Sequence, residues 1–330
     1  MTSLLTRPYE PDDARTYVEL AANAFSVASA HARPTDSAAF VAHVHSDRNP
    51  AGRSFATLAE HEGRCAGHLS GIPFRYRRRD GSLVTCWQLG LFAVDASLHR
   101  QGIGGALLKH QIAEHARERP ADFAYGYPNP RSLGLLLSWG LRQCLHVPAH
   151  VAPPPLRRSS ALRDERGDAW ELAVVDAAAA GAALERVVYG EPGRGRFVRD
   201  AAFFRWRFLG PDADVRYRFV ALERRGGGDT MLVALAEHAA LGTQFTVLVD
   251  GAPDLTQGRL GLALRAARIA GGRRPVYLTT NVRWSGGPAA VRVPRHLDPR
   301  PVVPFLMPGS EALFPELAQA SYLTGDWMSF

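Results

Sequence analysis

Lysine and cysteine are scarce in this chain of 330 residues. Lys109 is the single lysine, although lysine and arginine together number 39 against 32 acidic residues. The three cysteines, Cys65, Cys86 and Cys144, are isolated and odd in number, and the sequence has no Cys-x-x-Cys pair and no Cys/His ligand spacing. These absences argue against a disulfide framework and against a structural zinc site, so we expect no metal.

Long apolar runs and a secretion signal are also lacking. Residues 1–7 contain no basic segment followed by an apolar one, and no run approaches the length that spans a bilayer. We therefore expect a cytoplasmic protein without membrane contact. The net charge of +7 and the pI of about 9.7 suit an anionic ligand such as a nucleotide. A nucleic-acid partner is not expected, because the one dense basic cluster, residues 75–79, adjoins a turn and is typical of a solvated hairpin tip.

The composition is that of an ordinary globular protein, 46% hydrophobic and 22% charged, and it is long enough for two domains. Hydrophobic periodicity in the first half predicts strands at residues 4–7, 55–60, 65–74, 83–94 and 123–127, and helices at 11–25, 37–45, 103–119 and 130–139. The second half repeats the order helix, three strands, helix, strand. Residues 147–160, rich in Pro, Arg and Ser, are the candidate linker, with an ordered crossover as the alternative. We predict a mixed α/β fold with domains at residues 1–150 and 160–330.

The most informative segment is residues 91–109. An apolar strand ends at Val94, and Gly102-Ile103-Gly104-Gly105 opens a helix. Glycines let a backbone come close to a ligand, and the free N–H groups at a helix start attract phosphates. The pattern is neither the dinucleotide fingerprint, because position 107 is Leu, nor a P-loop. A tight turn that packs a helix on a strand is the alternative.

The motifs around this turn resemble those of the GNAT family of acyltransferases. The strand is followed by His99-Arg-Gln-Gly-Ile-Gly104, then by Asn129-Pro-Arg-Ser132, then by Trp139-Gly-Leu141. In that family the loop pattern is Arg/Gln-x-x-Gly-x-Gly/Ala, whose amides hold the pyrophosphate of coenzyme A, and the later Asn touches the pantetheine arm. The resemblance covers about residues 1–150 and implies a GNAT acyl-CoA N-acyltransferase fold with acetyl-CoA as co-substrate. The binding residues that it implies are Phe92, Ala93, Val94, His99, Arg100, Gln101, Gly102, Ile103, Gly104, Gly105, Asn129 and Ser132.

Two departures from the family concern catalysis. Many members place the Tyr that protonates the leaving thiolate where this chain has Leu136. The tandem-domain survival acetyltransferases place it at the position of Leu141. Tyr125 and Tyr127 lie at the end of the following strand, on one face of it, and Tyr127 is the preferred acid because it is nearer the strand end.

The general base has several candidates. Glu60, Asp95 and His68 are possible from the residues alone. In two tandem GNAT families the C-terminal carboxylate is the base, and the apolar end of this chain therefore suggests the carboxylate of Phe330. A terminal strand is the alternative reading of that end. His43 and His45, two apart on a predicted helix, are expected at the surface.

The second half resembles a GNAT-like repeat without a working cofactor loop. Residues 257–261 open a helix but lack the Gly-x-Gly spacing, and the aromatic segment 200–208 resembles a Trp-Arg-Phe/Tyr segment of two-part GNAT proteins, with a packing helix as the alternative. The resemblance implies an N-acyltransferase that moves acetyl from acetyl-CoA to a small-molecule amine, with the second half covering the acceptor pocket. A non-catalytic CoA-binding module and a macromolecular amine acceptor are the alternatives.

Overall fold

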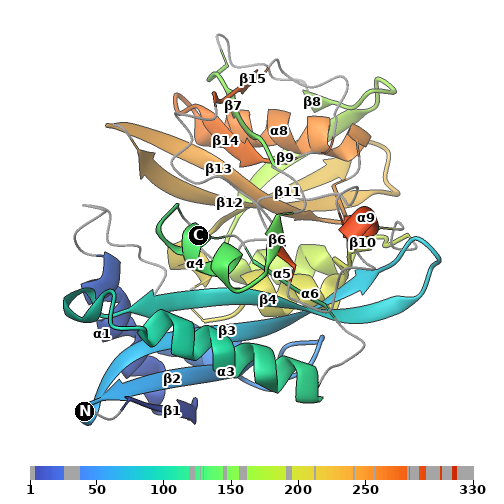
Figure 1. Ribbon diagram of the computed structural model, residues 1–330. Coiled ribbons are helices and arrows are strands. Elements are labelled where there is room, and N and C mark those ends of the chain that lie inside the picture. Colours follow the sequence, from blue (N-terminus) through green and yellow to red (C-terminus); the bar gives the residue numbers. More distant parts are fainter. Residues whose placement is uncertain are drawn as a thin grey trace. The chain divides into compact units, whose positions relative to one another are not determined.

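The chain divides into two compact units (Figure 1). Unit 1 holds the described residues up to 143 and those between 300 and 320, and unit 2 those between Val147 and Pro299. No helix in these described parts is long and apolar enough to cross a membrane. The computed structural model describes residues 4–25, 38–118, 123–126, 128, 130–143, 147–155, 162–190, 195–211, 213–240, 242–255, 257–280, 282, 290–294, 305–306 and 314–317.

Unit 1 is built on a mixed sheet in which five strands follow the order β1-β2-β3-β4-β5. Neighbours are antiparallel except β4 and β5, which are parallel. The long β3 is buried almost throughout, as expected of a strand covered on both faces. The short strands β6 and β16 form a separate pair. The strands are β1 (Leu4–Pro8), β2 (Phe55–His61), β3 (Arg64–Arg77), β4 (Leu83–Val94), β5 (Phe123–Gly126), β6 (Arg142–Gln143) and β16 (Phe305–Leu306).

Helices cover both faces of this sheet. On one face α1 places Tyr17, Leu20 and Ala24, at spacings of three and four, against Ala93 of β4. On the other face α3, which Figure 1 shows lying across β2 and β3, buries Leu107 and its neighbours on the sheet. The helices of unit 1 are α1 (Asp13–Phe25), α2 (Ala38–Val44), the 3-10 helix η1 (Ala96–Leu98), α3 (Ile103–Glu118), α4 (Pro130–Ser138) and α9 (Phe314–Leu317).

Unit 2 contains a larger mixed sheet of order β15-β7-β14-β13-β12-β11-β9-β8. Its strands are β7 (Ala149–Ala152), β8 (Leu162–Arg163), β9 (Ala169–Val175), β11 (Arg218–Arg224), β12 (Thr230–Ala240), β13 (Thr243–Ala252), β14 (Val276–Thr279) and β15 (Val291–Arg292). The short β10 (Arg196–Phe197) belongs to unit 2 but not to this sheet. Its helices are α5 (Ala177–Leu184), α6 (Ala201–Phe208), α7 (Ala213–Arg216) and α8 (Gln257–Gly271).

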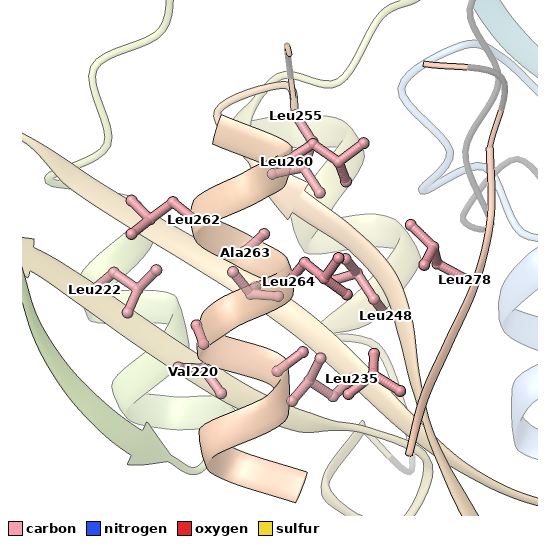
Figure 2. Close-up of a cluster of buried hydrophobic side chains, with 14 of the residues drawn as sticks. Val220, Leu222, Leu235, Leu248, Leu255, Leu260, Leu262, Ala263, Leu264 and Leu278 are labelled. Atoms are coloured by element: carbon pink, nitrogen blue, oxygen red, sulfur yellow. The ribbon is translucent and has the colours of Figure 1, made fainter. Parts of the chain in front are cut away.

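The core of unit 2 lies between α8 and the sheet. Leu260, Ala263 and Leu264 of the helix point toward Val220 and Leu248 on the strands (Figure 2). Burial of one such leucine stabilises a fold by about 1.5–3 kcal/mol. This contact is what fixes the start of α8 against the end of β13.

The two units share one order of strand pairing. In unit 1, β1 is followed by two helices, then by β2, β3 and β4, α3 and the parallel β5. In unit 2, β9 is followed by α5, the short β10, α6 and α7, then by β11, β12 and β13, α8 and the parallel β14. The register of the last antiparallel pair shifts in both units, between His68 and Ser70 in unit 1 and between Ala234 and Leu235 in unit 2. Each crossover helix therefore begins where an irregular strand ends.

The predicted mixed α/β fold is confirmed. Part of the candidate linker at 147–160 is in fact a strand, because residues 149–152 form β7 and pair with β14, more than a hundred residues later. Beyond the first half's predicted elements, residues 142–143 form β6 and Val147 makes an isolated bridge. The domain limits of 1–150 and 160–330 stay a prediction.

Candidate functional site

The loop between β4 and α3 is held by short local hydrogen bonds. Asp95 donates its N–H to the carbonyl of Ala66 on β3 at 3.0 Å. Its Oδ1 accepts the N–H of Ser97 at 2.8 Å and the hydroxyl of Ser97 at 2.6 Å, which lowers the pKa of Asp95. The His99 ring donates Nε2–H to the carbonyl of Val94 at 3.2 Å. The loop is therefore tied to the strand end from which it leaves.

The first turn of α3 offers unpaired backbone N–H groups. The amide of Ala106 is the first to bond along the helix, to the carbonyl of Gly102 at 2.9 Å. The N–H groups of Ile103, Gly104 and Gly105 precede it and have no partner among the described residues. Such groups, together with the positive end of the helix dipole, form a site for an anion.

Gly102 keeps the approach to these groups open. Its φ of +83° lies in the left-handed region, which favours glycine, and a Cβ built there meets no atom within 4 Å. The preceding Arg100 is also left-handed, with φ +67°, and exposed, as is Gln101. The loop thus presents a guanidinium and an amide side chain to solvent, beside N–H groups that have no partner among the described residues, which suits a phosphate ligand.

Gly104 is also closely surrounded by side chains of the protein itself. A Cβ at this position would lie 3.0 Å from Leu135 and 3.3 Å from Phe92. Glycine is favoured there because α3 packs closely on β4 and α4. The predicted contact of its backbone with a ligand stays a prediction. At Gly105 a Cβ would meet the Trp139 ring at 3.6 Å, an ordinary contact.

The edge of β4 becomes free of backbone partners before the loop begins. Its ladder with β5 covers only the residues from Cys86 to Leu89. From Gly90 to Val94 no described residue pairs with that edge, so the strands separate there. Phe92 and Val94 pack toward α3, and Ala93 packs toward α1, so what this edge offers a ligand is mainly its backbone.

A β-bulge lies in the same segment. His68 is opposite Ala93 and Ser70 is opposite Gly90, so that Leu91 and Phe92 together face a single residue of β3. Leu91 has φ +48°, which a residue with a Cβ rarely adopts. The bulge therefore bends β4 next to the anion site of α3.

Comparison with known proteins identifies this arrangement. The acetyltransferase (GNAT) domain family matches residues 6–137. Residues 6–137 form a GNAT acetyltransferase domain. The predicted family is thereby confirmed for these residues, and the glycine-led start of α3 lies within them. Comparison with curated protein sequences gave no match.

Solved structures share the fold of this chain. A protein of Enterococcus faecalis V583 described as a probable N-acyltransferase is 11% identical, with a TM-score of 0.58, and the match covers 92% of this chain and 72% of that one. A GCN5-related N-acetyltransferase of Anabaena variabilis is 12% identical, with a TM-score of 0.57 and the same coverage. Eis1 of Mycobacterium abscessus is 13% identical, with a TM-score of 0.55, and the match covers 96% of this chain and 76% of that one. At such identities the likeness concerns the fold.

The described residues of the GNAT domain include most of the predicted binding positions. Phe92 to Val94 and His99 to Gly105 lie together along the end of β4 and the start of α3. Ser132 lies in the first turn of α4. Tyr127, Asn129 and Phe330 lie outside the described residues, so the two predicted catalytic groups stay predictions.

The other acid and base candidates are engaged elsewhere. Glu60 accepts Nε–H of Arg7 at 2.6 Å, and the same guanidinium is bidentate to Asp13, with both contacts at 2.7 Å. The ring of Tyr125 is buried between Phe74 and Phe123. These contacts give both candidates a structural role.

His68 is also a poor base. Its side chain is fully buried, and burial, with the nearby His45, lowers its pKa to about 3. A base of that pKa cannot take a proton efficiently from an amine near neutral pH. The expectation that His45 lies at the surface is wrong, because its ring stacks on Tyr9 at 4.3 Å and is buried. The sequence shows no signal for this, since the ring is buried by an aromatic residue from a distant strand end.

Proposed function

We propose that the protein transfers an acetyl group from acetyl-CoA to the amine of a small molecule. The observation that carries the proposal is the open, glycine-led start of α3, where the N–H groups of Ile103, Gly104 and Gly105 face no protein acceptor in the described parts of unit 1. A diphosphate is the ligand chemistry that such a helix start binds best. Membership of residues 6–137 in an acetyltransferase family supports coenzyme A as its source.

Binding roles follow from the placement of the loop. The amides from Arg100 to Gly105 would hold the diphosphate, with the exposed guanidinium of Arg100 as a further partner. The unpaired edge from Phe92 to Val94 would run beside the pantetheine arm and offer an N–H to the thioester oxygen. Asn129 and Ser132 would contact the same arm from the start of α4.

The reaction requires one bond to form and one to break. The lone pair of a neutral amine attacks the thioester carbon, a C–N bond forms, and the C–S bond breaks. The nitrogen loses one proton and the thiolate gains one. We assign the proton that the thiolate receives to the Tyr127 hydroxyl, and the acceptance of the amine proton to the carboxylate of Phe330. Adding residues after Phe330 should then lower turnover without unfolding the protein.

We propose that the CoA site of unit 1 has no counterpart in unit 2. We also propose that unit 2 is a second GNAT-like domain, on the basis of its repeated strand pairing. At the start of α8, however, a Cβ on Gly258 would lie 3.4 Å from the carboxylate of Glu165. The side chain of Leu255 fills the space beside Gly251, where a Cβ would lie only 2.6 Å away. A carboxylate and a leucine thus stand where unit 1 keeps an open turn.

A non-catalytic CoA-binding module is the second candidate. Leu136 and Leu141 occupy the two positions at which related enzymes carry the acidic Tyr, and both side chains are buried in the core under α3. Those positions therefore have a packing role in this chain. Binding of coenzyme A without acetyl transfer is what this alternative predicts.

The deciding experiment has two stages. Thermal unfolding is first measured with and without coenzyme A, since ligand at 100 times its Kd stabilises by about 2.7 kcal/mol. Release of free thiol from acetyl-CoA is then followed with a panel of small amines. Amine-dependent thiol release supports the transferase. Binding with no release from any amine would favour the module, and absence of binding would contradict both.

A further inference from the structure

The carbonyl of Leu91 has an unusual partner. Leu91 belongs to the bulge of β4, where two residues face one on β3, and so it has no regular place in the ladder. Its carbonyl instead accepts a hydrogen bond from Nδ1–H of His68 at 2.8 Å. Since a carbonyl oxygen can only accept, the ring must carry its proton on Nδ1.

The surroundings of His68 keep this ring neutral and fixed. It is fully buried and contacts the rings of Tyr17 at 4.5 Å, His45 at 5.7 Å and Tyr9 at 6.0 Å between centroids. Asp13 on α1 and His45 at the end of α2 are the titratable groups whose charge acts on it, with opposite effects on its pKa. Burial has the larger effect and disfavours the imidazolium.

The conformation that this hydrogen bond holds is costly. A residue with a Cβ in the left-handed region is disfavoured by roughly 1–2 kcal/mol, so the φ of +48° at Leu91 needs a compensating interaction. Leaving the carbonyl of Leu91 without a partner would add the cost of an unsatisfied, partly buried acceptor. His68 removes that cost at a residue of β4 that lies within its free edge, Gly90 to Val94.

We infer that His68 is a positioning residue, which fixes the bulge at Leu91 and thereby aims the backbone N–H groups of Phe92 to Val94 at the acyl group. This inference rests on the proposed acetyl transfer. His68 is buried and does not itself reach the substrate. It controls the orientation of the backbone N–H that stabilises the developing oxyanion. Small misplacements of such groups cost about a hundredfold in rate.

The test compares three variants of the full chain. His68→Leu removes the donor. His68→Asn returns an N–H at the same number of bonds from Cβ as Nδ1. His45→Leu is the matched control, because His45 is also buried but bonds to Val41 and Ser70 and not to β4. Each variant is measured for thermal stability, for affinity toward coenzyme A, and for kcat with acetyl-CoA and an accepted amine.

The inference predicts a split between rate and affinity. His68→Leu should lower kcat by at least about tenfold, while coenzyme A binding, which we assign mainly to the amides of residues 100–105, changes less than about threefold. His68→Asn should recover most of the rate, and His45→Leu should lose stability with little loss of kcat. Equal losses of kcat in His68→Leu and His45→Leu, or wild-type kcat in His68→Leu, would overturn it.

A second readout does not depend on activity. Hydrogen exchange of the backbone amides of residues 90–94 is measured in the absence of any ligand. The exchange rate should rise in His68→Leu and return to the wild-type rate in His68→Asn, while His45→Leu leaves it unchanged. Unchanged exchange in His68→Leu would overturn the positioning role even if the wild-type protein transfers acetyl. Faster exchange with no acetyl transfer in the wild type would show instead that the proposed function had failed.

Discussion

Acid should destabilise unit 1 through two buried histidines. Burial lowers the pKa of His45 to about 4 and that of His68 to about 3, whereas an exposed histidine has a pKa of about 6.5. Below that value the unfolded chain binds protons that the folded chain does not bind. Stability is therefore complete above about pH 7 and is lost as the pH falls through 6.5 toward the folded pKa values.

The magnitude follows from the same values. At pH 5.5 each unfolded histidine is about nine-tenths protonated, while the folded rings remain almost neutral, which costs about 1.4 kcal/mol per ring and about 3 kcal/mol for both. Urea unfolding at pH 7.5 and pH 5.5, followed by circular dichroism, measures this difference. The double variant His45→Asn/His68→Asn should reduce the difference in unfolding free energy between the two pH values by about 3 kcal/mol. It also lowers the stability at pH 7.5.

The matched control is His99→Asn, because His99 is exposed. Its pH dependence of unfolding should match that of the wild type. A His45→Asn/His68→Asn protein that keeps the full wild-type loss of stability between the two pH values would refute the reasoning. The acid-sensitive groups would then have to lie elsewhere.

Further predictions concern glycines and a buried ion pair. Gly104→Ala should lower the free energy of unfolding by about 1–2 kcal/mol, because its Cβ would crowd Leu135, and should leave coenzyme A affinity of the folded protein within about threefold in calorimetry. Gly102→Val should weaken coenzyme A binding by about tenfold or more, whereas Gly81→Val, with φ +92° and equally open space in a distant turn, should not. In unit 2, Arg199→Met should destabilise by about 3–5 kcal/mol in urea unfolding, because Asp250, at 2.8 Å and fully buried, loses its partner; Arg199→Met/Asp250→Leu should recover most of that loss.

Local patterns made much of unit 1 predictable. The strand ending at Val94 and the glycine-led start of α3 are encoded by neighbouring residues, apolar alternation followed by a turn, and these indicate where the proposed anion site lies. The family motifs then suggested the ligand. What these features share is that a few consecutive residues determine them.

Features that depend on distant pairing were not predictable. The bulge at Leu91 exists because of the register between β3 and β4, which a single sequence does not show. The packing role of Gly104 depends on Leu135, about thirty residues later, and the strand β7 depends on β14. The buried state of His45 likewise depends on Tyr9. In each case the deciding neighbour is far along the chain.

Hydrogen exchange with saturating coenzyme A tests the central claim, that the start of α3 binds the diphosphate. We predict that the ligand slows exchange most strongly at the amides of residues 100–105, to a smaller extent at residues 90–94, and not at the turn around Gly81. Slowing at the start of α8, around Gly258, with the amides of Ile103 to Gly105 unchanged, would contradict the claim.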